Sequence, residues 1–264
     1  MEIAGYIASL FIGISLGLIG GGGSILTVPV MVYLFGINPL LATSYSLFIV
    51  GSTSLVGAIN NYRKGQVNIQ TALYFGAASI VTVFITRKFI VPAIPHNLGT
   101  IAGFTLTSGL LTMLLFAVLM LIASVSMIRE DKSTDMDLDP VQDTPFIKLL
   151  GYGVMIGLIT GLLGAGGGFL LIPALVLLVR IPMKKAIGTS LLIIALNSLI
   201  GFTGDLGHFS IDWKFLLIIT FIAIGGIVIG GLLSKKIPSG KLKKGFGWFV
   251  LIMGIYIILK EITA

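Results

Sequence analysis

Long intervals without a charged residue restrict this chain to a membrane-embedded fold. A helix needs about 20 apolar residues to cross a bilayer, and the uncharged intervals provide room for many crossings. Only 10% of the 264 residues are charged and 56% are hydrophobic, whereas soluble domains carry about 25% charged residues. The sequence therefore predicts an all-α polytopic membrane protein with almost no soluble domain. The intervals without Asp, Glu, Lys or Arg include 3–62, 89–128, 149–179, 186–204 and 215–234.

A polar linker divides the chain into two similar halves. The linker, REDKSTDMDLDPVQDTP, begins at residue 129, and each half begins with a glycine cluster that is followed by a proline. These clusters lie in FIGISLGLIGGGGSILTVP, residues 11–29, and GLITGLLGAGGGFLLIP, residues 157–173. The pattern indicates a duplicated unit, which is common in transporters. The predicted parts are a first membrane repeat at 1–128, an acidic linker at 129–146 and a second membrane repeat at 147–264.

Each half is predicted to contain five helical segments. The second segment of each half is too short to cross a bilayer alone, so it either completes a broken helix or returns as a re-entrant hairpin. The predicted segments lie near 3–19, 24–36, 40–60, 68–86 and 98–128, and near 147–163, 168–180, 186–204, 213–233 and 244–260.

The distribution of positive charge favours inverted repeats. If the glycine segments are hairpins, each half has an odd number of crossings and the halves have opposite orientations. The loops at 61–67, 129–148, 180–185 and 234–244 then share one side and hold 13 of the 17 Lys and Arg residues. Parallel halves separate these cations only 10 against 7. Because cytoplasmic loops are enriched in Lys and Arg, we expect inverted halves with both termini outside.

The glycine clusters predict a polar spot inside the membrane. Each glycine lowers helix stability by about 1 kcal/mol relative to alanine, and broken backbone at membrane depth is tolerated only inside protein or beside a wet cavity. The helix that restarts after each break presents free N–H groups, which favour an anion. Two such breaks could converge on one anion. The alternative is close helix packing, for which the spacing of Gly13, Gly17 and Gly21 is typical.

Polar side chains add candidates to this site. The pairs Thr43-Ser44 and Thr189-Ser190 occupy matching positions in the two halves, and helix capping is the alternative explanation for them. No ionisable residue is expected deep in a span, so the predicted site depends on dipoles and hydroxyls. The predicted substrate-binding residues are Gly20, Gly21, Gly22, Gly23, Ser24, Thr43, Ser44, Gly164, Gly166, Gly167, Gly168, Thr189, Ser190 and Asn197.

One loop gathers ionisable residues that are candidates for coupling or gating. Asp205, His208 and Asp212 lie close together in the sequence. A solvated loop is the simpler explanation for such a group.

Several functional classes lack their required residues. The chain has no cysteine and two histidines in unrelated places, which argues against thiolate catalysis and a metal site. No GxxxxGK[ST] motif is present, and no catalytic constellation is visible. The net charge of +7 lies in short loops without interleaved aromatic residues, which argues against nucleic-acid binding. The sequence therefore predicts neither an enzyme nor a cofactor.

The paired glycine, proline and Thr-Ser signatures resemble the sulfite exporter TauE/SafE family. The resemblance covers nearly the whole chain, although Ala165 replaces the glycine found at Gly21 and Ser24 replaces the glycine found at Gly168. It implies a multi-pass permease of the cell membrane that carries sulfite or an organosulfonate by alternating access. The expected partners are a small anion, the lipid bilayer, a coupling ion (H⁺ or Na⁺) and a second copy of the chain in a homo-oligomer. A channel and a non-transporting accessory subunit are the alternatives.

Overall fold

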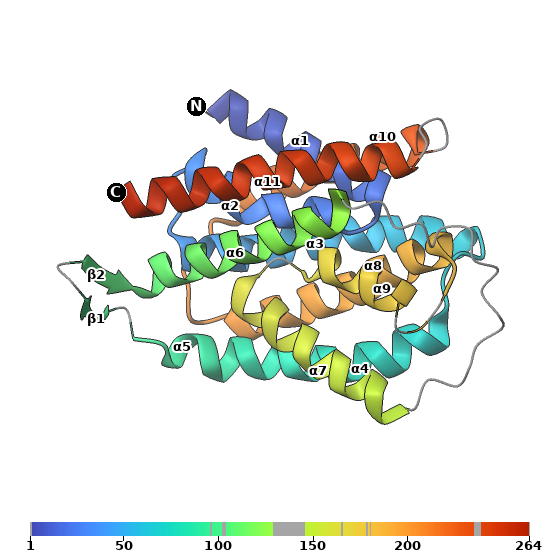
Figure 1. The fold of residues 1–264 in the computed structure, drawn as a ribbon, viewed down its shortest axis with the longest axis horizontal. Coiled ribbons are helices and arrows are strands. Elements are labelled where there is room, and N and C mark those ends of the chain that lie inside the picture. Colours follow the sequence, from blue (N-terminus) through green and yellow to red (C-terminus); the bar gives the residue numbers. More distant parts are fainter. Residues whose placement is uncertain are drawn as a thin grey trace.

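The computed structural model describes residues 2–95, 97–101, 104–128, 146–164, 166–177, 179, 181–234 and 239–263. The first half contains α1 (Glu2–Ile19), η1 (Gly22–Leu26), α2 (Thr27–Tyr33), α3 (Pro39–Arg63), α4 (Ile69–Ile85), η2 (Thr86–Ile90), α5 (Val91–Ala93), β1 (Asn97–Ile101), β2 (Phe104–Thr107) and α6 (Ser108–Ile128). The second half contains α7 (Phe146–Leu163), α8 (Gly168–Leu177), α9 (Met183–Asp205), α10 (Trp213–Leu233) and α11 (Ser239–Thr263). The helices lie side by side in one bundle, with both termini at the same end (Figure 1).

The prediction of an all-α membrane bundle is confirmed. Within the described part of the chain, five helical spans are long and apolar enough to cross a bilayer: α3, α4 through α5, α6, α9 and α10. The prediction of a helix from residue 98 is wrong, because 97–107 forms an antiparallel hairpin and α6 begins at Ser108. Thr100 and Thr105 pair across this hairpin, and β-branched residues of this kind favour strands.

Polar residues begin three of the long helices. Asn38 accepts a hydrogen bond from the backbone of Leu40 at 3.0 Å and precedes Pro39, whose fixed φ suits a first helical position. Asn68 caps α4, and Asp212 caps α10 in the matching position of the second half. These caps satisfy backbone N–H groups that would otherwise lack a partner at a helix start.

The first glycine segment belongs to a helical hairpin. The ring of Phe35, which follows α2, lies 5.8 Å from the ring of Tyr6 near the start of α1. α1 therefore leaves one end of the bundle, and the chain returns to that end through η1 and α2. In the second half, Leu149 near the start of α7 shares a buried cluster with Val179 and Ile181, which follow α8.

α1 packs against α10 of the other half through glycines. A Cβ built on Gly13 would lie 2.9 Å from the Cα of Gly226, and one on Gly17 would lie 3.0 Å from the carbonyl carbon of Gly230. The later residue of α1 contacts the later residue of α10, so the two helices are parallel. Small residues that let two helices touch are typical of membrane bundles, which confirms the packing explanation for Gly13 and Gly17.

The equivalent contact in the second half joins α7 to α4. A Cβ on Gly153 would lie 3.0 Å from the Cβ of Ala78, and one on Gly161 would lie 2.7 Å from the Cβ of Thr86. These two helices are also parallel. The first helix of each half therefore packs mainly against a helix of the other half.

α3 and α9 lie at the centre of the bundle and are antiparallel. Gly51 approaches Leu199, whereas Asn61, later in α3, approaches Gly188, earlier in α9. α10 runs parallel to α3, and α4 runs parallel to α9. The buried core forms two clusters, one mainly on α1, α3, α6, α10 and α11 and the other mainly on α4, α7, α8 and α9.

Candidate functional site

The two glycine breaks meet inside the bundle. A Cβ built on Gly21 would lie 2.6 Å from the carbonyl oxygen of Gly168, and a Cβ on Gly168 would lie 2.6 Å from the carbonyl oxygen of Gly21. Real Cβ atoms do not approach backbone this closely, so both positions require glycine. The duplication thus brings two interrupted backbones together at one point. The role of these glycines in binding stays a prediction.

The second break also uses backbone conformations that favour glycine. Gly164, Gly166 and Gly167 have φ angles of +67°, +66° and +68°. This left-handed region is rarely adopted by residues with a Cβ. Close approach and positive φ together explain why the cluster contains several glycines rather than one.

Some of the predicted hydroxyl donors are occupied by the main chain around the breaks. The Ser24 hydroxyl donates to the carbonyl oxygen of Gly21 at 2.8 Å. The Ser190 hydroxyl donates to the carbonyl of Ile187 at 2.9 Å and lies 3.4 Å from the carbonyl oxygen of Gly20. These two side chains therefore stabilise the first break as observed.

Other buried polar atoms beside the breaks have no partner in the described structure. The Ser198 hydroxyl lies 2.9 Å from a Cβ built on Gly166, and the Thr160 hydroxyl faces Gly167. Unpaired polar groups in an apolar interior are costly, and a polar ligand or water would reduce this cost. The unpartnered oxygens belong to Thr27, Ser44, Ser46, Ser54, Thr86, Thr160, Asn197 and Ser198.

Three predicted site residues join helices to one another. Thr189 accepts a hydrogen bond from the backbone N–H of Asn68 at 2.9 Å. The Asn197 side-chain amide donates to the Ser79 hydroxyl at 2.6 Å and so connects α9 to α4. Thr43 donates to the carbonyl of Leu40 and also contacts a buried cation, described next.

A buried ion pair lies beside the second break, and the sequence analysis missed it. Nη1 of Arg87 lies 3.3 Å from Oδ2 of Asp205 and donates to the Thr43 hydroxyl at 2.9 Å. The side chains of Arg87 and Asp205 are 0% and 1% exposed. The expectation that no ionisable residue lies deep in a span is therefore wrong for Arg87, which lies inside the span from Ile69 to Ala93.

The helix boundaries explain this error. The span that begins at α4 continues through the π-helical turn η2 and α5 to Ala93, so Arg87 lies within it rather than beyond its end. α9 continues to Asp205, one residue past the predicted end. The available signal was an arginine inside an otherwise apolar run, because ionisable residues within spans are costly and usually functional.

The three predicted coupling residues have different environments. Asp205 is buried, whereas His208 and Asp212 are exposed. Asp212 caps α10, and its backbone N–H donates to the Tyr45 hydroxyl at 2.8 Å. A solvated position therefore describes His208 and Asp212 but not Asp205.

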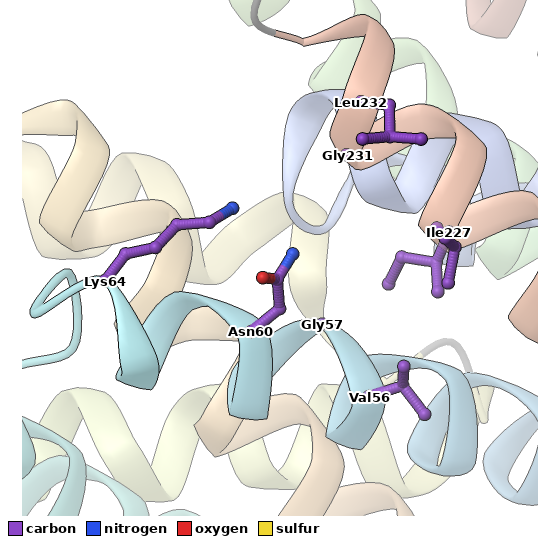
Figure 2. A pocket seen from close by; sticks show the side chains of 8 residues that line it. Val56, Gly57, Asn60, Lys64, Ile227, Gly231 and Leu232 are labelled. Atoms are coloured by element: carbon purple, nitrogen blue, oxygen red, sulfur yellow. The ribbon is translucent and has the colours of Figure 1, made fainter.

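The position equivalent to Arg87 in the second half is open. Gly231 occupies the same place relative to the cap Asp212 as Arg87 does relative to the cap Asn68. A cavity of about 290 Å³ lies there between α3 and α10, where Figure 2 shows Asn60 and Lys64 on one helix and Gly231 on the other. The two equivalent helix contacts thus differ. The contact of α9 with the span of α4 contains the ion pair of Arg87 and Asp205, whereas the contact of α3 with α10 contains a pocket.

Gly231→Cys is expected to react with a membrane-impermeant thiol reagent. A Cβ at this position meets only Asn60 Nδ2 at 3.8 Å, and the exposed Lys64 lies at the rim of the pocket. The chain has no native cysteine, so single substitutions give an unambiguous signal. Ser9→Cys is the matched control, since Ser9 lies in α1 away from the proposed site, is fully buried and should not react. Equal labelling of both variants would contradict this assignment.

The comparisons with known proteins agree on one family. The family model described as sulfite exporter TauE/SafE matches residues 6–257. The chain is 32% identical to a probable membrane transporter protein of Xylella fastidiosa strain 9a5c, over 95% of this chain and 92% of that protein. It is 26% identical to the probable membrane transporter protein YjnA of Bacillus subtilis strain 168, over 98% of this chain and the full length of that protein. No solved structure matches the chain.

Proposed function

Because this chain belongs to the sulfite exporter TauE/SafE family of membrane transporters, we propose that it is a secondary transporter of a small sulfur oxyanion such as sulfite or an organosulfonate. The observation that carries this proposal is the convergence of the two glycine breaks at Gly21 and Gly168. Unpartnered buried hydroxyls beside these breaks supply donors for a polar ligand.

The chemistry of the site suits an oxyanion. Sulfite and sulfonate oxygens accept hydrogen bonds, and hydroxyls and backbone N–H groups donate them. Glycines allow the backbone to approach such a ligand closely. In this proposal, Thr160 and Ser198 contact the anion, while the hydrogen bonds of Ser24 and Ser190 hold the backbone of the first break in its observed conformation.

The proposed transport mechanism is alternating access between two inverted halves. The opposite directions of α3 and α9 and the exchange of α1 and α7 between the halves support this arrangement. Rocking of one set of helices against the other would expose a central site to each side in turn. We propose that the protein lies in the cell membrane with both termini outside, so that the Lys64 end of the bundle faces the cytoplasm.

Flux through the purified full-length protein in liposomes tests this function. The expected result is sulfite uptake that saturates and is accelerated by unlabelled sulfite trapped inside, since counterflow is characteristic of a carrier. Sulfate, phosphate and acetate at equal concentration are the specificity controls. Fast flux without counterflow would indicate a channel. Absence of flux for sulfite, thiosulfate and sulfoacetate would contradict the proposal and favour an accessory role.

A further inference from the structure

We propose that Arg87 is the charged anion-binding group of this transporter, and that the Asp205 carboxylate competes with the transported oxyanion for this cation. The inference rests on the function proposed above and adds to it a specific cation and an internal competitor. It comes from the unused hydrogen-bonding capacity of Arg87, its position and its lack of a counterpart in the second half.

The guanidinium of Arg87 is largely unused. It has five N–H donors in a planar fork, but only Nη1 has partners, namely Thr43 and Asp205. Nε and Nη2 have none, although the side chain is completely buried. A buried cation with unpaired donors is costly, so this group is prepared for a ligand with additional oxygen atoms.

Asp205 holds the cation by a single contact. One carboxylate oxygen meets one nitrogen at 3.3 Å, whereas Arg and a carboxylate commonly form two parallel hydrogen bonds. The Ser44 hydroxyl lies near this carboxylate but makes no hydrogen bond of standard geometry. A small oxyanion that accepts from both Nε and Nη2 would bind the edge of the guanidinium that Asp205 leaves free, and would compete with Asp205 for the charge of the cation.

The unused donors point to the second glycine break. A Cβ built on Gly164 would lie 2.5 Å from Nη2 of Arg87, so the guanidinium packs directly against this glycine and a residue with a side chain would clash with it. Thr86, the neighbour of Arg87 in the chain, also has an unpartnered buried hydroxyl. Cation, glycine backbone and hydroxyls thus form one polar cluster, in which Nε and Nη2 of Arg87 have no acceptor.

In the part of the chain that the structure describes, the duplication contains one such cation. Among the described residues, Arg87 and Asp205 are the charged side chains that are buried, and the position equivalent to Arg87 is Gly231 beside the pocket. A site built on Arg87 therefore takes one anion per chain, although the backbone framework is repeated.

Anion-dependent thermal stabilisation of purified full-length variants tests the inference. We would titrate sulfite at constant ionic strength, with gluconate as the balancing anion, and obtain an apparent Kd for each variant. Asp205→Asn is expected to bind about tenfold more tightly than the wild type, because it removes the negative charge that competes with the anion for Arg87. Arg87→Gln is expected to bind at least about tenfold more weakly, because it loses the charge-assisted bonds.

Two further variants separate binding from folding. Arg87→Gln combined with Asp205→Asn leaves no buried charge, so it should fold and still fail to bind sulfite. Glu261→Gln is the matched control, because Glu261 also accepts a hydrogen bond, from Tyr33 at 2.7 Å, and lies in the last turn of α11. It changes net charge equally and should leave the apparent Kd unchanged.

The outcomes distinguish this inference from the proposed function. Unchanged or weaker binding by folded Asp205→Asn would overturn the inference, as would wild-type affinity in the double variant or an equal gain in Glu261→Gln. If the wild type transports sulfite under any of these results, the proposed function stands without a role for Arg87. If neither the wild type nor Asp205→Asn responds to sulfite, thiosulfate or sulfoacetate, both proposals fail.

Discussion

Gly168→Ala is expected to lower the free energy of unfolding by about 3 kcal/mol and to abolish transport. The added methyl group would lie 2.6 Å from the carbonyl oxygen and 2.7 Å from the Cα of Gly21. Both atoms belong to backbone, which cannot rotate away as a flexible side chain can, and overpacking of a tight interior costs about 1–3 kcal/mol or more. The unfolding free energy would be measured by denaturant titration in mixed micelles, and transport by sulfite flux in liposomes.

Gly225→Ala provides the matched control for this prediction. Gly225 lies in α10, is exposed, and has no heavy atom within 4 Å of a built Cβ. The same substitution there should leave stability unchanged or raise it by up to about 1 kcal/mol, because alanine favours helix more than glycine does. If Gly168→Ala were as stable and active as Gly225→Ala, the contact between the two breaks would be wrong.

Asp205→Ala is expected to cost about 3–5 kcal/mol of stability in the absence of a bound anion, because it leaves the Arg87 guanidinium buried without a counter-ion. The fully buried position of both side chains prevents water from replacing the lost partner. Arg87→Leu should cost a similar amount for the opposite reason, since it leaves an isolated carboxylate. Unfolding free energies of the single variants, measured in the same micelles, would test both values.

The double variant Arg87→Leu with Asp205→Ala completes the cycle. Its loss of stability should be clearly smaller than the sum of the two single losses, because no unpaired charge remains. Additive losses would show that the two side chains do not interact in the membrane-embedded protein. A loss below about 1 kcal/mol in each single variant would place the pair in water, where ion pairs contribute little.

The helices of the bundle could be predicted from the sequence because bilayer thickness imposes a length on apolar segments. Uncharged runs located α3, α9 and α10 to within a few residues, and the duplication indicated that the glycine segments are equivalent. The hairpin at 97–107 could not be found in this way, because threonines and glycines interrupt an apolar run without adding charge. Hydrophobicity alone does not distinguish a strand from a helix over ten residues.

The sequence by itself determined that this chain is a duplicated membrane bundle with two glycine breaks, since hydrophobic length, charge distribution and internal repetition are local properties. Only the tertiary structure decided that Gly21 touches Gly168 and that the first helix of each half packs against the other half. It also decided that Arg87 in η2 meets Asp205 at the end of α9. These contacts join residues at least 75 positions apart, as Ala78 and Gly153 are. They depend on how helices pack, and packing is a property of shape and burial that no single segment contains.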